Sequence, residues 1–265
     1  LEITDHGAMY GVIEFYKKAK ENEIKPIIGV EAYTTTSKLT ERPEREKTQN
    51  NHLLLLAKNE EGYKNLMKLT SIAHIEGYYY RPRIDKATLK KFAKGLICTS
   101  ACAIGEVAQY LAEDNYEKAR ETASWYHDLF GEDYYLEVQR HEYEKYISDA
   151  QDQEIKNELQ KMTKMEKAIN EGIIKLSKDL AIPIVATNDA HYIDHDSATA
   201  QDVLVCVSTG KLVSEIKRIR IVDAPTFYLR PPQEMEALFP DLPEAISNTL
   251  KIADKCNLEI PTFGK

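Results

Sequence analysis

Residues 182–192 read Ile182-Pro183-Ile184-Val185-Ala186-Thr187-Asn188-Asp189-Ala190-His191-Tyr192, an apolar run that passes directly into a polar one. The apolar part is short, β-branched and bounded by polar residues, which predicts a buried strand. Asp189 and His191 follow its carboxyl end two positions apart, so both side chains point to the same side. A carboxylate beside an imidazole suits a divalent metal ion. A polar loop leaving a strand fits this stretch equally well. The residues at the ends of the other predicted strands therefore decide between a metal site and a loop.

Other predicted strands carry similar side chains near one end. The strand at 1–6 ends in His6, the strand at 27–33 contains Glu31, the strand at 52–57 opens with His52, and the strand at 96–102 runs into Cys102. An ionised carboxylate such as Glu31 inside an apolar run must be paired or metal-bound, because an isolated buried charge is too costly. If the strand at 52–57 returns beside its predecessor, His52 lies close to Glu31.

Strands alternate with helices along the chain, which predicts an α/β fold. Polar residues at the carboxyl ends of several strands favour a barrel with its site on that face. A sixth strand is expected at 134–138. Glu137 and His141 near its end are further site candidates, but we expect both to lie at the surface. Besides the strand at 182–186, a further strand is expected at 226–230. Helices are expected at about 8–22, 59–73, 85–94, 115–130, 148–181, 197–207, 231–238 and 243–256.

Composition narrows the class of protein. The chain has 265 residues, 43% hydrophobic and 29% charged, which suffices for one large α/β domain or two smaller ones. No apolar run reaches the roughly 18–20 residues of a membrane span, and no N-terminal signal pattern is present. The formal charge of −8 argues against nucleic-acid binding through the overall charge of the chain. Any contact with nucleic acid would be local, through a basic patch or a bound metal ion. The chain opens on Leu1 without a Met, and we expect a fragment that lacks its true N-terminus.

The four cysteines do not make a disulfide framework in a chain of this length, which indicates a reducing, cytoplasmic compartment. None forms a Cys-x-x-Cys pair, which argues against a zinc ribbon or finger. The sequence also lacks a Gly-x-x-x-x-Gly-Lys loop, a Gly-x-Gly-x-x-Gly fingerprint and a serine nucleophile elbow.

The candidate site residues come from five strand edges and are imidazoles, carboxylates and one thiol, a mixture that suits zinc, manganese or iron rather than calcium. Taken singly, His52 fits a capping or surface histidine, and Cys102 fits an ordinary buried cysteine. The set is His6, Glu31, His52, Cys102, Asp189 and His191.

These motifs, in this order, resemble the PHP (polymerase and histidinol phosphatase) family: Thr4-Asp5-His6-Gly7, Gly29-Val30-Glu31, Asn51-His52-Leu53, Ser100-Ala101-Cys102 and Thr187–Tyr192. The resemblance is strongest to the PHP domain of bacterial DNA polymerase III alpha subunits. It extends over essentially the whole chain, through Gln201–Leu204, Thr209–Lys211, Phe227–Arg230, Glu234-Met235 and Asn257–Ile260.

The resemblance implies a distorted seven-stranded α/β barrel that holds up to three zinc, manganese or iron ions in a cleft. By position, the six candidates match six of the family's metal ligands, and Asp5 would be a neighbour of that shell. The remaining family ligands lie in an upstream His-x-His segment and a nearby acidic or histidine position, so the first barrel strand is expected to be missing here. Residues 1–265 would form one PHP domain whose tail, from about 226, leads toward a polymerase core.

The resemblance also implies a function. The domain would be a metal-dependent phosphoesterase, acting through the six ligands as a 3′–5′ exonuclease, within a replicative enzyme that carries out DNA-directed DNA synthesis. Its partners would be the primer 3′ end of DNA and other replisome subunits, among them a proofreading subunit. Two alternatives stay open. One is a metal-braced structural and docking module without catalysis of its own, and the other is a small-molecule phosphatase of the histidinol phosphatase type.

Overall fold

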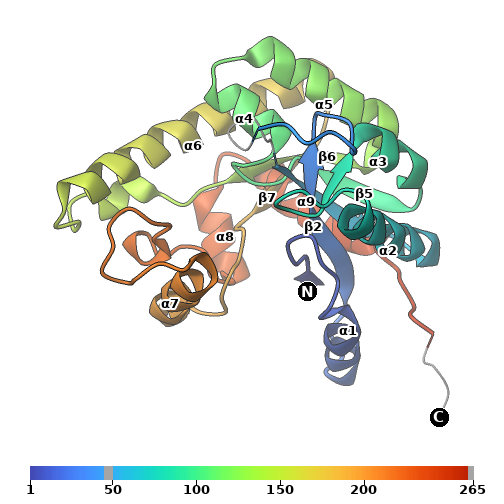
Figure 1. Cartoon of the computed structure of the whole chain (residues 1–265), viewed down its shortest axis with the longest axis horizontal. Coiled ribbons are helices and arrows are strands. Elements are labelled where there is room, and N and C mark those ends of the chain that lie inside the picture. The colour runs from blue at the N-terminus through green and yellow to red at the C-terminus, as the bar shows by residue number, and fades with distance from the viewer. Residues whose placement is uncertain (45–49, 262–265) are drawn as a thin grey trace.

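The computed structural model describes residues 1–44 and 50–261, and in these ranges one curved sheet lies among nine α-helices (Figure 1). The strands are β1 (Glu2–Ile3), β2 (Ile27–Thr35), β3 (Asn51–Ala57), β4 (Arg83–Asp85), β5 (Leu96–Thr99), β6 (Tyr134–Gln139) and β7 (Ile184–Thr187). The helices are α1 (Val12–Glu21), α2 (Glu60–Ile75), α3 (Lys86–Phe92), α4 (Glu106–Ala112), α5 (Tyr116–Phe130), α6 (Gln153–Leu180), α7 (Ala198–Thr209), α8 (Pro232–Leu238) and α9 (Pro243–Lys255).

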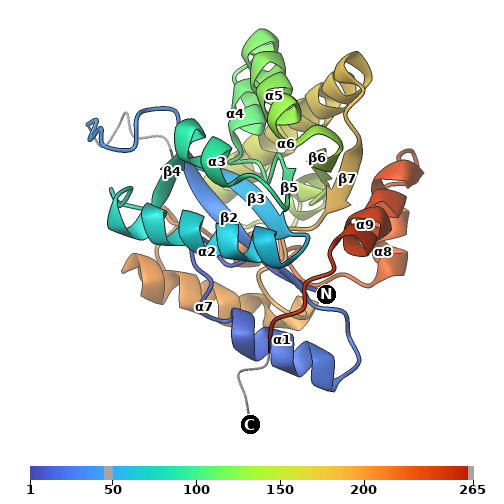
Figure 2. The same cartoon turned by 90° about the vertical axis from the view of Figure 1, so that its right-hand side faces the viewer.

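The sheet has the order β1-β2-β3-β5-β6-β7, and β4 pairs with the carboxyl-terminal end of β2. Its pairs are parallel except at β3, which runs antiparallel to both β2 and β5. Helices α2 and α3 lie on one side of the strands, α4 to α6 on another, and α8 and α9 beside β7 (Figure 2). Within the described ranges the edge strands β1 and β7 do not pair with each other, so the curved sheet is open between them.

The expected α/β class is confirmed, but one predicted strand is wrong and one strand was missed. Residues 226–230 form an extended segment and not a strand. Its only β-bridge in the described part of the chain joins Tyr192 to Tyr228, because Pro231 and Pro232 follow at once and begin α8. Strand β4 was missed because it is only three residues long and two of them, Arg83 and Asp85, are charged.

Side chains alternate between the two faces of the sheet, as the period of a strand requires. Ile28 and Val30 of β2 and Leu55 of β3 pack on the convex face beneath the helices. The concave face is apolar at one end, where a second cluster contains Ile27, Leu54, Leu56, Ile97, Ala101, Tyr135, Val185, Ile252 and Cys256. Burying each of these large side chains stabilises the fold by about 1.5–3 kcal/mol. The other end of the concave face is polar and carries the candidate site.

The longest helix, α6, has 28 residues and begins where the Asp152 side chain accepts the N–H groups of Glu154 and Ile155. It carries charged residues along its whole length. No helix in the described part of the chain is both long and apolar enough to cross a membrane.

Candidate metal centre

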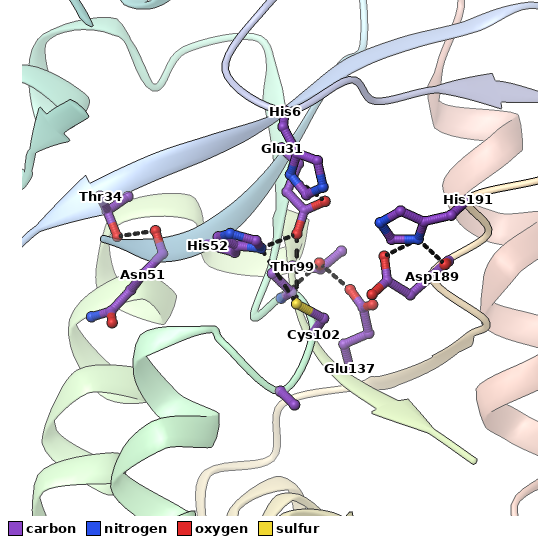
Figure 3. A network of polar contacts seen from close by, with 12 residues as sticks. His6, Glu31, Thr34, Asn51, His52, Thr99, Cys102, Glu137, Asp189 and His191 are labelled. Carbon is purple, nitrogen blue, oxygen red and sulfur yellow. Dashed lines mark hydrogen bonds and ion pairs between the residues drawn. The ribbon is translucent and has the colours of Figure 1, made fainter. Parts of the chain in front are cut away.

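Three of the predicted residues form one polar group. Glu31 lies in the middle of β2, His52 at the start of β3, and His6 in the segment that follows β1. His52 Nδ1 lies 2.6 Å from Glu31 Oε1, and His6 Nδ1 lies 3.3 Å from Glu31 Oε2 (Figure 3). The register of the strands brings this about, since Tyr33 pairs with His52 and the Gly7 N–H donates to the Glu31 carbonyl oxygen at 2.9 Å. The expectations that His52 lies close to Glu31 and that Glu31 is paired are both confirmed.

The imidazoles control the charge of Glu31. Burial alone would raise its pKa, but the hydrogen bond to His52 and the charges of His52 and His6 outweigh burial, so the pKa lies below its usual value. Burial lowers the pKa of His6, and His52 and His191 lower it further while Glu31 opposes them. One nitrogen or oxygen from each of His6, Glu31 and His52 lies within 4.8 Å of the others. Two imidazoles and a carboxylate at this spacing fit a zinc, manganese or iron ion.

Cys102 is buried beside this group. Its Sγ lies 3.6 Å from Glu31 Oε1 and 3.5 Å from His52 Nδ1. The turn after β5 that places it is closed by Gly105, where a Cβ atom would come within 2.1 Å of the Ser100 carbonyl oxygen. Burial raises the pKa of the thiol well above its usual range, and Asp189 and Glu31 raise it further, so the thiol is neutral unless a cation lies next to it.

Asp189 and His191 follow β7, as expected, and face the same cavity. His191 Nδ1 lies 2.7 Å from the Asp189 carbonyl oxygen and 3.7 Å from Asp189 Oδ1. A proton on Nδ1 bonded to that carbonyl leaves Nε2 with a free lone pair. The His191 ring lies 5.7 Å from the His6 ring between centroids. Burial raises the pKa of Asp189 to about 6, and the charge of His191 only partly offsets it.

All of these groups except His52 border one cavity of about 610 Å³. His6, Glu31, Cys102, Asp189 and His191 all line it, and the cavity continues over the apolar end of the concave face to α9. Asp5 also lines the cavity but is exposed, and it contacts the site through its backbone carbonyl, which accepts the Glu31 N–H at 3.2 Å.

Glu137 does not lie at the surface, where it was expected. It is buried in the cavity wall, where its carboxylate accepts hydrogen bonds from Thr99 Oγ1, Thr187 Oγ1 and, at 2.8 Å, Gln139 Nε2. Burial raises its pKa to about 7 despite the two threonine hydroxyls. Strand alternation was the available signal, because Tyr135, Glu137 and Gln139 share the concave face of β6.

His141 is also buried, so its expected surface placement is wrong as well. Its Nδ1 lies 3.1 Å from Thr226 Oγ1, and its ring stacks on Phe227 with 4.2 Å between centroids. Burial lowers the pKa of His141 to about 3, helped by the charges of Arg230 and His191. A neutral, packed imidazole of this kind supports the segment 226–230.

Comparison with known proteins gives a consistent picture. The PHP domain family model matches residues 1–141. The chain is 45% identical to the DNA polymerase III subunit alpha of Borreliella burgdorferi, over 97% of this chain and 21% of that protein. It is 42% identical to the subunit alpha of Chlamydia muridarum, over 100% of this chain and 22% of the relative, and 42% identical to that of Helicobacter pylori strain 26695, over 98% and 20%. The chain thus spans about a fifth of the length of these relatives.

Proposed function

The chain belongs to the PHP domain family, and from this membership and the cavity we propose that it is the phosphoesterase domain of a bacterial DNA polymerase III alpha subunit. The proposed reaction is metal-dependent 3′–5′ removal of nucleotides from a DNA primer end. The observation that best supports this proposal is that three possible metal ligands surround one carboxylate. His6, His52 and Cys102 all lie within 3.6 Å of Glu31.

We assign the binding of divalent ions to His6, Glu31, His52, Cys102, Asp189 and His191, with up to three zinc, manganese or iron ions in the intact protein. All of these residues except His52 line the cavity, and His52 contacts Glu31 from beside it. When bound, such ions lower the pKa of a water molecule and stabilise charge on a phosphate. Glu31 Oε2 lies next to His6 and Oε1 next to His52, so its carboxylate would join both imidazoles in holding such ions. His191 keeps a free Nε2 because its Nδ1 is engaged by the Asp189 backbone.

We also propose that a further strand fills the opening between β1 and β7 and closes the barrel. The cavity reaches from Ile3 of β1 to Val185 of β7 and is lined there by Leu54, Leu56 and Ile252. An apolar slot between two unpaired strand edges suits a strand with one apolar face. The upstream His-x-His segment that the family resemblance implies would add imidazoles at the polar end of this slot.

For the longer protein, the proposal includes DNA-directed DNA synthesis, and DNA and other replisome subunits as partners, a proofreading subunit among them. The relatives named DNA polymerase III subunit alpha support it. Residues 1–265 would be one PHP domain in a cytoplasmic enzyme, with the tail from about 226 leading to the polymerase core. The last four residues of that tail, 262–265, lie outside the described residues.

The test is release of nucleotides from the labelled 3′ end of primed DNA by the full-length protein with Mn²⁺ and no deoxynucleotides. His191→Ala should lower the rate at least about 100-fold, because loss of a metal ligand costs more than loss of an outer contact. His195→Ala is the matched control, since His195 is exposed and does not line the cavity. Equal rates for the wild type and His191→Ala would refute the assignment.

A second candidate is a metal-braced scaffold without catalysis. The contacts of Glu31 with His52 and Cys102 favour it, because they join β2 to β3 and to the turn after β5. Metal sites can supply folding energy directly. If Cys102→Ala lowers the melting temperature while wild type and variant both show only background nuclease activity, the scaffold is the correct function.

A further inference from the structure

Arg230 is held beside the candidate metal centre by Asn188. The Asn188 Nδ2 donates to the carbonyl oxygens of Thr226 and Tyr228, both at 2.7 Å, and Asn188 Oδ1 accepts Arg230 Nε at 3.1 Å. Asn188 is buried and immediately precedes Asp189. The segment 226–230 is therefore fastened to the end of β7, and Arg230 lines the same cavity as His191.

The outer edge of the Arg230 guanidinium lacks a close acceptor. Its Nη1 lies 3.8 Å from Glu234 Oε2, beyond hydrogen-bond distance, and neither Nη donates a hydrogen bond to residues 1–44 or 50–261. Glu234 instead accepts the Tyr228 hydroxyl. The Arg230 side chain is only 9% exposed, and its guanidinium carbon lies 5.0 Å from the centre of the Tyr228 ring.

Two other arginines in this chain each bind one carboxylate through two nitrogens. Arg218 donates through Nη1 and Nη2 to Asp202 at 2.9 and 2.7 Å, and Arg220 donates through two nitrogens to Asp223 at 2.6 and 2.9 Å. A buried cation without such a partner is costly. The Arg230 side chain is buried to a similar degree, but its nearest carboxylate, Glu234, lies 3.8 Å away and accepts no hydrogen bond from it, which leaves two donors for an anion in the cavity.

We propose that Arg230 binds a phosphate group of the substrate in this cavity, an inference that rests on the proposed phosphoesterase function. A planar guanidinium fork matches the oxygens of a phosphate and binds two of them at once. With Nε fixed by Asn188, the fork keeps its orientation before the ligand arrives, so less conformational entropy is lost on binding. The substrate class is a phosphate ester of a nucleotide or nucleic acid.

The experiment is calorimetric titration of thymidine 5′-monophosphate into the full-length protein loaded with Mn²⁺. Arg230→Gln should weaken binding about 10- to 100-fold, the effect of losing hydrogen bonds to a charged group. Arg230→Lys keeps the charge without the fork and should give an intermediate loss. Arg120→Gln is the control for the change in net charge, because Arg120 is exposed on α5 and does not line the cavity. It should bind like the wild type.

The inference is overturned if the wild type does not bind the nucleotide, or if Arg230→Gln and Arg230→Lys, each melting within a few degrees of the wild type, bind it equally well. If Arg230→Gln unfolds, the Arg230→Lys titration decides alone. Nuclease assays on the same proteins separate this result from the proposed function. If Arg230→Gln binds the nucleotide more weakly but the wild type has no nuclease activity, the phosphate site is supported and the proposed nuclease function is refuted. If the nuclease activity depends on His191 but the arginine variants bind the nucleotide like the wild type, the phosphate site is refuted and the proposed nuclease function is not.

Discussion

The candidate site has two halves with opposite electrostatics. The imidazole half (His6, Glu31 and His52) surrounds its carboxylate with two rings, and the pKa of Glu31 is lowered. The carboxyl half (Glu137, Asp189 and His191) buries two carboxyl groups near one ring, and their pKa values rise to about 7 and about 6. The imidazole half is balanced by the protein alone, whereas the carboxyl half needs protons or cations to offset its burial. This difference predicts where metal ions stabilise the fold and where they chiefly act on bound ligands.

The largest effect is expected in the imidazole half. Glu31→Gln removes the one carboxylate that both His6 and His52 contact, and should lower Mn²⁺ affinity and nuclease activity at least about 100-fold. Elemental analysis after gel filtration gives the metal content, and the labelled-primer assay gives the activity. Full metal content in the variant would remove Glu31 from the ligand set.

The carboxyl half should make the metal-free protein sensitive to pH. Because the folded-state pKa of Glu137, about 7, lies above the ordinary 4.5, its stabilisation is complete below pH 4.5 and is lost as the pH rises to 7. The loss amounts to about 3 kcal/mol in the free energy of unfolding. Glu137→Gln should remove it, so the variant should exceed the wild type in stability at pH 8. Urea unfolding at pH 5 and pH 8 measures both.

Glu166 provides the matched control for this prediction. Burial raises its pKa to about 7 as well, but it lies on α6, accepts the His141 N–H and does not line the cavity. Added Mn²⁺ should therefore suppress the pH dependence that arises from Glu137 and leave that from Glu166 intact. Equal suppression of both would show that no cation binds near the carboxyl half.

A smaller effect is expected where threonine hydroxyls support Glu137. Thr187→Val keeps the shape of the side chain but removes a donor to the buried carboxylate, and should cost about 1–3 kcal/mol at pH 8. In the Glu137→Gln background the same substitution should cost less, because no buried charge remains to be solvated. A double-mutant cycle measures this coupling, and additive losses would mean that the hydroxyl does not act through Glu137.

The smallest effect is expected at Asp5, which the family resemblance places next to the ligands. Its carboxylate is exposed and its backbone carbonyl makes the contact with Glu31. Asp5→Asn should therefore change the free energy of unfolding by less than about 0.5 kcal/mol, as most surface substitutions do. A tenfold loss of Mn²⁺ affinity in this variant would restore Asp5 as a functional neighbour of the metal.

Much of the site could be predicted from the sequence, but the imidazole half more completely than the carboxyl half. Polar residues near strand ends predicted the convergence of His6, Glu31 and His52, because strand order and direction alone bring them together. The surface position expected for Glu137 was wrong, because which face of β6 is concave depends on the curvature of the whole sheet. The segment 226–230 has the residues of a strand, but the Asn188 side chain and two prolines decide its form.

The most direct measurement is the position of manganese in crystals of the full-length protein soaked with Mn²⁺, located by anomalous scattering. We expect a peak in contact with Glu31 and with His6 or His52, and further density on the side of Asp189 and His191. A protein that takes up Mn²⁺ elsewhere and leaves Glu31 without a metal neighbour would contradict it.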